Sequence, residues 1–325
     1  MEFFYSLTPS KVLDTVDAAL GTGQRTTGRF LTLNSLENRV FDLELEDDSH
    51  IVAKFYRPGR WSRAAILDEH RFLLDLTAAE VPAVAPVALS DGSTLASTDD
   101  GILFALFPKV RGRSEQELSD AQLDQVGRFL ARIHNVGAAT AAPHRQHLSV
   151  EQYGQPALDS LLESGQIDIQ LQSRYQRVAS ALLGCCKTLL AGCEQQRIHG
   201  DCHLGNLLFH HDAPLFLDFD DMLLGPPVQD IWMVVRGRDA FAQAQRERLL
   251  AAYETLRTFD RSSLRLIEPL RALRMLHFSS WIARRYADPI FPRTFPEFTS
   301  YRYWLDETSA LEEQLALIES LPILH

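Results

Sequence analysis

The chain of 325 residues has no long apolar segment, little cysteine and no excess of positive charge. No apolar run approaches the ~18 residues of a membrane-spanning helix, so we expect no membrane association. The N-terminus, Met1–Phe4, lacks the basic and apolar regions of a signal peptide. A net charge of −11 argues against nucleic acid as a partner. These absences favour a globular protein of the cytoplasm.

The four cysteines are too few and too closely grouped to predict a disulfide framework. Cys185, Cys186 and Cys193 lie on a segment with a helical pattern, which favours buried, reduced thiols. Cys202 follows them among several histidines, but no C-x-x-C pair occurs and the gaps match no usual zinc site. A zinc–thiolate site therefore stays a minor alternative.

The sequence pattern changes from strand-like to helical near Pro108. Before it, alternating apolar residues predict strands at 30–33, 40–45, 51–56, 84–89 and 102–107, with one helix from a Ser62 N-cap to about Thr77. After it, helical periods cover 120–136, 172–195, 240–259 and 264–286, the first opening on a capping box. We expect an α+β fold with a β-rich N-terminal lobe (1–107) and a mainly helical C-terminal lobe (108–325).

The segment His199–Asn206, followed by Leu217–Asp220, carries the strongest chemical signal. Asp201 stands five residues before Asn206, the step found in the protein-kinase catalytic loop, and Asp218-Phe219 stands where that motif set has D-F-G. Asp201 is suited to accept the proton of an attacking hydroxyl. Carboxylate and amide oxygens from Asp218 and Asn206 suit Mg²⁺. Asp201 and Asp218 are thus the predicted catalytic residues, and Asn206 and Asp218 the predicted metal ligands.

The spacing between these residues indicates a hairpin. Residues 207–209 and 214–217 are strand-like, and 210–213 form a link of hairpin length. In an antiparallel hairpin the numbers of paired residues have a constant sum, which is 423 for a turn centred between His211 and Asp212. The numbers of Asn206 and Asp218 add up to 424, one away from that sum. We therefore expect Asn206 and Asp218 to meet at the open end of the hairpin.

Three further residues are candidates for holding the nucleotide. Lys54 lies mid-strand in a V-A-K sequence close to the V-A-I-K pattern, on the face that carries Val52 and Tyr56. Its ion-pair partner is expected on the next helix, at Glu69, with Asp68 as the fallback. Ser35 is a weaker candidate.

Two positions depart from the kinase motifs. The loop 34–38 occupies the place of a glycine-rich phosphate loop but contains no glycine, although Asn and Ser can supply turn geometry and donors. Asp220 replaces the glycine of D-F-G and could reach the metal through a water molecule.

With these residues in hand, the chain resembles the aminoglycoside phosphotransferase and choline kinase branch of the protein-kinase-like fold. It is similar in particular to one group of that branch, the bacterial stress response kinase A proteins, which are Ser/Thr protein kinases. The resemblance covers nearly the whole chain and rests on the stretches 33–40, 54–58, 68–70, 81–82, 85–88, 199–203, 229–233, 267–272, 287–289 and 291–292.

The resemblance implies a two-lobed, monomeric, cytoplasmic kinase that uses ATP and Mg²⁺. It implies Asp201 as proton acceptor, Asn206 and Asp218 as metal ligands, and Ser35 as an ATP-side contact. It also implies a role in stress response, with phosphorylation of protein Ser/Thr residues, including the kinase's own.

The sequence leaves the chemical class of the phosphoryl acceptor open. Only eleven residues, 219–229, separate Asp218 from Asp230, which leaves no room for a long activation segment and favours a small-molecule hydroxyl as the alternative acceptor. A non-catalytic ATP-binding module is a third reading, disfavoured because Lys54, Asp201 and Asp218 are all present. Arg271, Arg274 and Arg285 are candidates for the acceptor surface.

Overall fold

The computed structural model describes residues 4–321 and groups the chain into two compact units. Unit 1 comprises Met1–Arg145, His199–Met222 and Met233–Thr258, and unit 2 comprises Gln146–Ile198, Leu223–Trp232 and Phe259–His325. An antiparallel sheet and a mostly helical remainder confirm the predicted α+β class. The lobe boundary expected at Phe107 stays a prediction.

Unit 1 is built on a five-stranded sheet in the order β1-β2-β3-β5-β4. Its strands are β1 (Thr26–Leu33), β2 (Arg39–Leu45), β3 (His50–Phe55), β4 (Ala96–Ser97) and β5 (Leu103–Pro108). The other elements of this unit are α1 (Pro9–Leu20), α2 (Arg63–Ala78), α3 (Asp120–Ala139), the hairpin β7 (Leu207–His210) and β8 (Ala213–Phe216), and α7 (Ala240–Tyr253).

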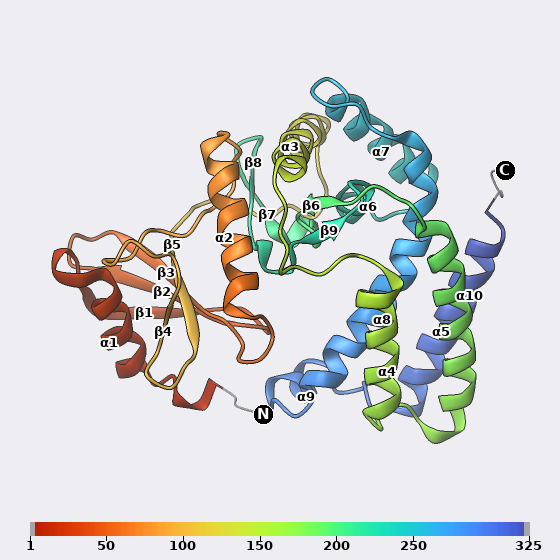
Figure 1. Ribbon diagram of the computed structural model, residues 1–325, viewed down its shortest axis with the longest axis horizontal. Coiled ribbons are helices and arrows are strands. Elements are labelled where there is room, and N and C mark those ends of the chain that lie inside the picture. Colours follow the sequence, from red (N-terminus) through yellow and green to blue (C-terminus); the bar gives the residue numbers. More distant parts are fainter. Residues whose placement is uncertain (1–3, 322–325) are drawn as a thin grey trace. The chain divides into compact units, whose positions relative to one another are not determined.

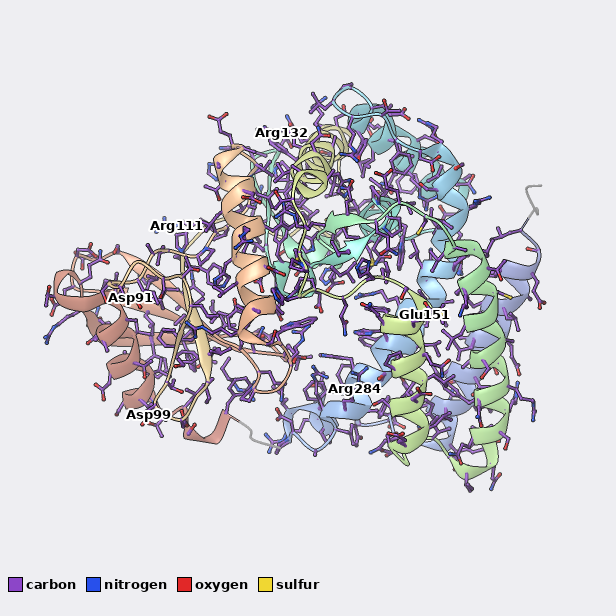
Figure 2. All side chains as sticks on the ribbon, viewed as in Figure 1. Asp91, Asp99, Arg111, Arg132, Glu151 and Arg284 are labelled. Carbon is purple, nitrogen blue, oxygen red and sulfur yellow. The ribbon has the colours of Figure 1, made fainter. Side chains whose placement is uncertain are left out.

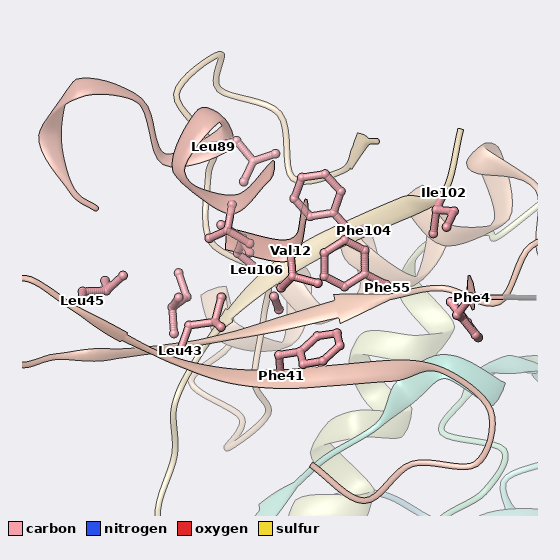
Figure 3. Close-up of a cluster of buried hydrophobic side chains, with 13 residues drawn as sticks. Phe4, Val12, Phe41, Leu43, Leu45, Phe55, Leu89, Ile102, Phe104 and Leu106 are labelled. Carbon is pink, nitrogen blue, oxygen red and sulfur yellow. The ribbon is translucent and has the colours of Figure 1, made fainter. Parts of the chain in front are cut away.

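Helices α1 and α2 lie on opposite faces of this sheet (Figure 1). On one face, odd-numbered residues of β2 and β3 pack with Val12 and Val16 of α1, forming the cluster drawn in Figure 3. On the other face, Tyr56 and Ala105 pack with Ile66 of α2. Alternation along β3 therefore places Lys54 on the α2 side, as predicted from the sequence.

Two expectations for this unit were wrong. Residues 84–89 form no strand, because Pro86 has no N–H to donate and only Val87 N bonds the neighbouring strand, at Leu106 O (2.8 Å); the short β4 takes the edge position instead. The sheet also carries a second helix, α1, which Thr8 caps by accepting a hydrogen bond from Lys11 N. The predicted Ser62 cap of α2 and the capping box of α3 are both confirmed.

Unit 2 is mostly helical. Its elements are α4 (Gln155–Glu163), α5 (Ile169–Leu190), β6 (Gln196–Ile198), β9 (Leu223–Gly225), α8 (Ile267–Arg285), α9 (Ile290–Thr294) and α10 (Tyr301–Glu319). Helix α6 (Val228–Val234) runs along the chain from this unit into the other. Strands β6 and β9 pair with each other, and α8 packs against α4 and α5.

The surfaces of both units are charged. The labelled side chains Asp91, Asp99 and Arg111 are exposed on unit 1, and Glu151 and Arg284 on unit 2 (Figure 2). Within residues 4–321, no helix is long and apolar enough to cross a membrane.

A tight helix–helix contact in unit 1 gives a first prediction. A Cβ added at Gly127 of α3 would lie 2.3 Å from the backbone oxygen of Leu249 in α7, whereas one added at the exposed Gly184 of α5 would meet nothing within 4 Å. Gly127→Ala should therefore lower the free energy of unfolding by about 1–3 kcal/mol. Gly184→Ala should raise it by up to about 1 kcal/mol, because alanine favours the helix.

Urea unfolding of both variants checks this contrast. Since each change is the same alanine substitution within a helix, the difference reports packing rather than helix propensity. A Gly127→Ala protein as stable as the wild type would show that α3 and α7 can separate without cost.

Candidate active site

The loop that carries Asp201 is fixed by the ring of His199. His199 Nε2 lies 2.8 Å from Leu217 O, and Asp201 N–H donates to His199 Nδ1 at 3.3 Å. Because a carbonyl oxygen only accepts, Nε2 carries the ring proton and Nδ1 is the acceptor. A neutral His199 therefore ties the backbone of Asp201 to the residue just before Asp218.

Asn206 closes the same loop through its side chain. The Asp201 carbonyl accepts from His203 N at 2.8 Å and from Asn206 Nδ2 at 3.0 Å, and Asn206 N donates to His203 O at 2.8 Å. The amide group of Asn206 uses its nitrogen in this contact, and its Oδ1 atom takes no part in it. The loop thus fixes the backbone of Asp201 and the amide group of Asn206 relative to each other.

The hairpin β7–β8 has the register predicted from the sequence. Leu207 pairs with Phe216 and His210 with Ala213, so the turn centres between His211 and Asp212. The link is tighter than the four residues expected: two residues form the turn, with His211 in the left-handed region (φ 55°). Leu217 N donates to Asn206 O at 2.9 Å, so Asp218 follows directly after the partner of Asn206.

Both outer edges of the hairpin are paired with other segments of unit 1. On β7, Phe209 exchanges two backbone hydrogen bonds with Arg113 (2.8 and 3.0 Å), and on β8 Phe216 N donates to Pro82 O at 2.8 Å. These bonds leave little freedom for the end of the hairpin that carries Asn206.

Asp218 has a strained backbone and a half-exposed side chain. Its φ of 55° lies in the left-handed region, which is costly for a residue with a Cβ. The next residue, Phe219, is buried between Phe72 of α2 and the ring of His199. This anchor holds the backbone, and the Asp218 carboxylate stays 54% exposed.

Three carboxylates lie around the ammonium group of Lys54. Its Nζ lies 3.0 Å from Asp218 Oδ1, 3.4 Å from Asp220 Oδ1 and 3.8 Å from Glu69 Oε1. Burial lowers the pKa of Lys54, but Asp218, Asp220 and Glu69 more than offset this effect and raise the pKa well above its ordinary value. Lys54 therefore remains charged although its side chain is buried.

Helix α2 presents Glu69 and Asp68 in different directions. Glu69 is fully buried and faces Lys54, as expected from the sequence. Asp68, the fallback, instead accepts from His144 N at 2.9 Å. Burial raises the pKa of Glu69 to about 7, although Lys54 acts in the opposite direction.

Ser35 lies in a braced loop. Its Oγ accepts from Asn38 N at 3.2 Å, and Arg57 donates to Leu36 O at 3.0 Å and to Glu37 O at 2.9 Å. Arginines thus hold the backbone where a glycine-rich loop would be mobile. The role of Ser35 as an ATP contact stays a prediction.

Sequence reasoning missed the residues around Asp220. Asp220 is 2% exposed and contacts Arg60 and Asn38, and its backbone oxygen accepts from Arg145. The one available signal was the aspartate itself, since a charged side chain in place of a buried glycine requires a cation nearby. The spacing of residues could not identify that cation, because Arg60 is distant from Asp220 in the sequence.

Comparison with known proteins places this site in a family. Residues 30–267 match the phosphotransferase enzyme family. Stress response kinase A of Escherichia coli K12 is 37% identical over 98% of this chain and 96% of its own length. Serine/threonine protein kinase RdoA of Salmonella typhimurium LT2 is 38% identical over the same shares. The chain belongs to the phosphotransferase enzyme family and, within it, to the stress response kinase A group.

Solved structures share the fold. Amicoumacin kinase hAmiN, in complex with AMP-PNP, Ca²⁺ and Ami, matches with a TM-score of 0.74 at 19% identity, covering 95% of this chain and 92% of its own. A microcompartment-associated aminopropanol kinase matches with a TM-score of 0.68 at 18% identity, covering 95% of each chain. These likenesses confirm the predicted kinase-like fold. Together with the family match, they identify the chain as a phosphotransferase.

The donors in unit 1 suit a divalent metal ion. Asp218 offers an exposed carboxylate. Asn206 offers its amide oxygen, because its hydrogen bond to Asp201 uses only the amide nitrogen. Two protein oxygens, with phosphates and water as the other ligands, suit a hard cation. Among residues 4–321, no group of three or more His, Cys, Asp or Glu side chains could hold a metal, and all four cysteines are free thiols.

The buried Glu69 gives a prediction for pH dependence. Its pKa is about 7 in the folded protein and 4.5 in the unfolded chain, so the folded state binds the proton more tightly. The free energy of unfolding should therefore fall as pH rises from about 4.5 to about 7, by up to about 3 kcal/mol from this group. Glu69→Gln should remove that part of the slope.

Urea unfolding across this pH range measures the effect, with Glu46→Gln as the control at an exposed glutamate. Parallel pH profiles for the wild type and Glu69→Gln would contradict a raised pKa at this position.

Proposed function

We propose that this chain is a bacterial stress-response kinase that transfers the γ-phosphoryl group of Mg·ATP to Ser or Thr hydroxyls of proteins, its own included. The observation that carries the proposal is whole-chain similarity: relatives named stress response kinase A and serine/threonine protein kinase RdoA match 98% of this chain. The same similarity supports a monomeric enzyme of the cytoplasm.

In this proposal, Asp201 is the proton acceptor. Its backbone is held by His199 on one side and by Asn206 on the other, which fixes where its carboxylate can point. Its side chain is 17% exposed, so an acceptor hydroxyl can reach it. A positioned carboxylate needs no unusual strength as a base, because phosphoryl transfer depends mostly on orientation and charge stabilisation.

Lys54, Glu69 and Ser35 are proposed to hold the nucleotide. The charged Lys54 would contact the α- and β-phosphates, and Glu69 behind it would fix the direction of the ammonium group. Ser35, on the loop braced by Arg57, would contribute an ATP-side contact. Asn206 and Asp218 would hold Mg²⁺, which would neutralise negative charge on the phosphates.

A small-molecule hydroxyl is the second candidate acceptor. It is favoured by the short segment 219–229, in which β9 and the start of α6 follow the metal-binding residue with no long loop. Arg271 and Arg285 of α8 are engaged within unit 2: Arg271 Nε lies 3.3 Å from Glu268 and its guanidinium over Trp232, and that of Arg285 lies over Trp281. These contacts do not decide the acceptor surface, for which Arg271, Arg274 and Arg285 all stay candidates.

Asp201 and Asp218 should respond differently to substitution. Asp201→Asn should lower turnover by about 10²–10⁴-fold, the range for a positioned acid–base group, with nucleotide affinity nearly unchanged. Asp218→Ala should abolish turnover and also weaken Mg²⁺-dependent ATP binding. Steady-state kinetics and isothermal titration with Mg·ATP separate the two effects. Full activity in Asp201→Asn, or unchanged Mg·ATP binding in Asp218→Ala, would remove that residue from its proposed role.

The acceptor class is tested by product analysis. After incubation with Mg·ATP, mass spectrometry should find phosphoserine or phosphothreonine on this chain or on a generic acceptor protein, and Asp201→Asn should show none. A panel of small alcohols and amino sugars is run in parallel. If the wild type labels no protein but phosphorylates a small hydroxyl compound efficiently, the second candidate replaces the first.

A further inference from the structure

Asp220 stands where protein kinases have glycine, and its carboxylate is surrounded by donors. Oδ2 accepts from Arg60 and from Asn38 Nδ2 (3.1 Å), and Oδ1 lies 3.4 Å from Lys54 Nζ. The side chain is 3% exposed. Burial opposes ionisation, yet Arg60, Lys54 and Arg145 more than offset it and hold the pKa of Asp220 below its ordinary value.

Asn38, at the end of the loop 34–38, connects that loop to Asp220 and to Arg57. Its Nδ2 donates to Asp220, its Oδ1 accepts from Arg57 N at 3.1 Å, and its own N–H donates to Ser35 Oγ at 3.2 Å. Asn38 is 3% exposed, so these bonds are shielded from water. A continuous path of hydrogen bonds therefore runs from Ser35 to Asp220.

Two arginines from the segment after β3 reinforce this path. Arg60 bonds the carboxylates of Asp220 and Asp221, and Arg57 bonds backbone oxygens of the loop. Both guanidinium groups also contact the carboxylate of Glu37, at 3.2 Å from Arg57 and 3.7 Å from Arg60. The loop and the segment that carries Asp218 are thus held by the same cations.

We propose that Asp220 is a positioning residue: through Asn38 and Arg60 it fixes the loop 34–38 relative to Lys54 and Asp218, and so makes a phosphate-binding loop without glycine rigid before ATP arrives. The inference rests on the proposed nucleotide-binding role of this loop.

The geometry distinguishes this role from metal binding. The Asp218 carboxylate is 54% exposed, whereas that of Asp220 is 3% exposed. Both oxygens of Asp220 already face cations or donors, and moving one to a metal ion would remove part of the buried counter-charge of Arg60 or Lys54. Asp218 can bind a cation from solvent without such a loss.

A charge swap tests the proposal. Asp220→Asn should raise the KM for ATP by about tenfold, the value of one buried hydrogen bond to a charged group, with a smaller effect on kcat. Asn38→Asp should raise the KM for ATP by about a further tenfold, because it places two carboxylates together. The double variant Asn38→Asp/Asp220→Asn restores a donor–acceptor pair and should recover most of that further loss.

Hydrogen–deuterium exchange without nucleotide supplies a readout that is independent of catalysis. Amides of residues 34–38 should exchange at least tenfold faster in Asp220→Asn and in Asn38→Ala than in the wild type. Asp221→Asn is the matched control: it also pairs with Arg60 but is 43% exposed, and it should leave loop exchange unchanged. If Asp220→Asn does not fold, the exchange of residues 34–38 in Asn38→Ala is compared with that of the wild type instead.

Two results would overturn the inference. One is unchanged loop exchange in both Asp220→Asn and Asn38→Ala. The other is a selective rise in the Mg²⁺ concentration needed for ATP binding by Asp220→Asn, with the loop unaffected, which would make Asp220 a metal ligand. A wild type that fails to bind ATP would count against the proposed function instead, and the exchange comparison would still decide whether Asp220 fixes the loop.

Discussion

The buried ammonium group of Lys54 is the interaction on which the rest of the site depends. A charge out of water costs several kcal/mol unless opposite charges accompany it. Here the compensation comes from separate parts of unit 1: Glu69 from α2, and Asp218 and Asp220 from the segment after the hairpin. The strand, the helix and the hairpin end must therefore assemble together, and a defect in any one removes part of the compensation for the buried charge of Lys54.

Sequence alone predicted the parts of this site that short-range rules control. The hairpin register followed from a short link between two apolar strands, and the face of Lys54 followed from strand alternation. Both depend on neighbours within a few residues. The strand expected at 84–89 is absent for a local reason as well, because Pro86 has no N–H to donate and so overrides the apolar pattern around it.

The contacts that hold Asp220 could not be predicted in the same way. Arg60 and Asp220 lie 160 positions apart, and nothing in the spacing of either residue indicates the other. Arginine and aspartate are ordinarily surface residues, so the sequence alone gives no reason to expect either to be buried. Only the tertiary structure shows that both are nearly buried. The roles assigned to Asp201, Asn206 and Asp218 remain predictions that the geometry supports.

The loop 34–38 shows how a fold can dispense with glycine. Glycine allows a backbone to approach phosphates closely, but it loses more conformational freedom on ordering than any other residue. In this chain, arginine contacts to backbone oxygens and the Asn38 bridge order the loop in advance. Such preorganisation lowers the entropy that a ligand must remove when it binds.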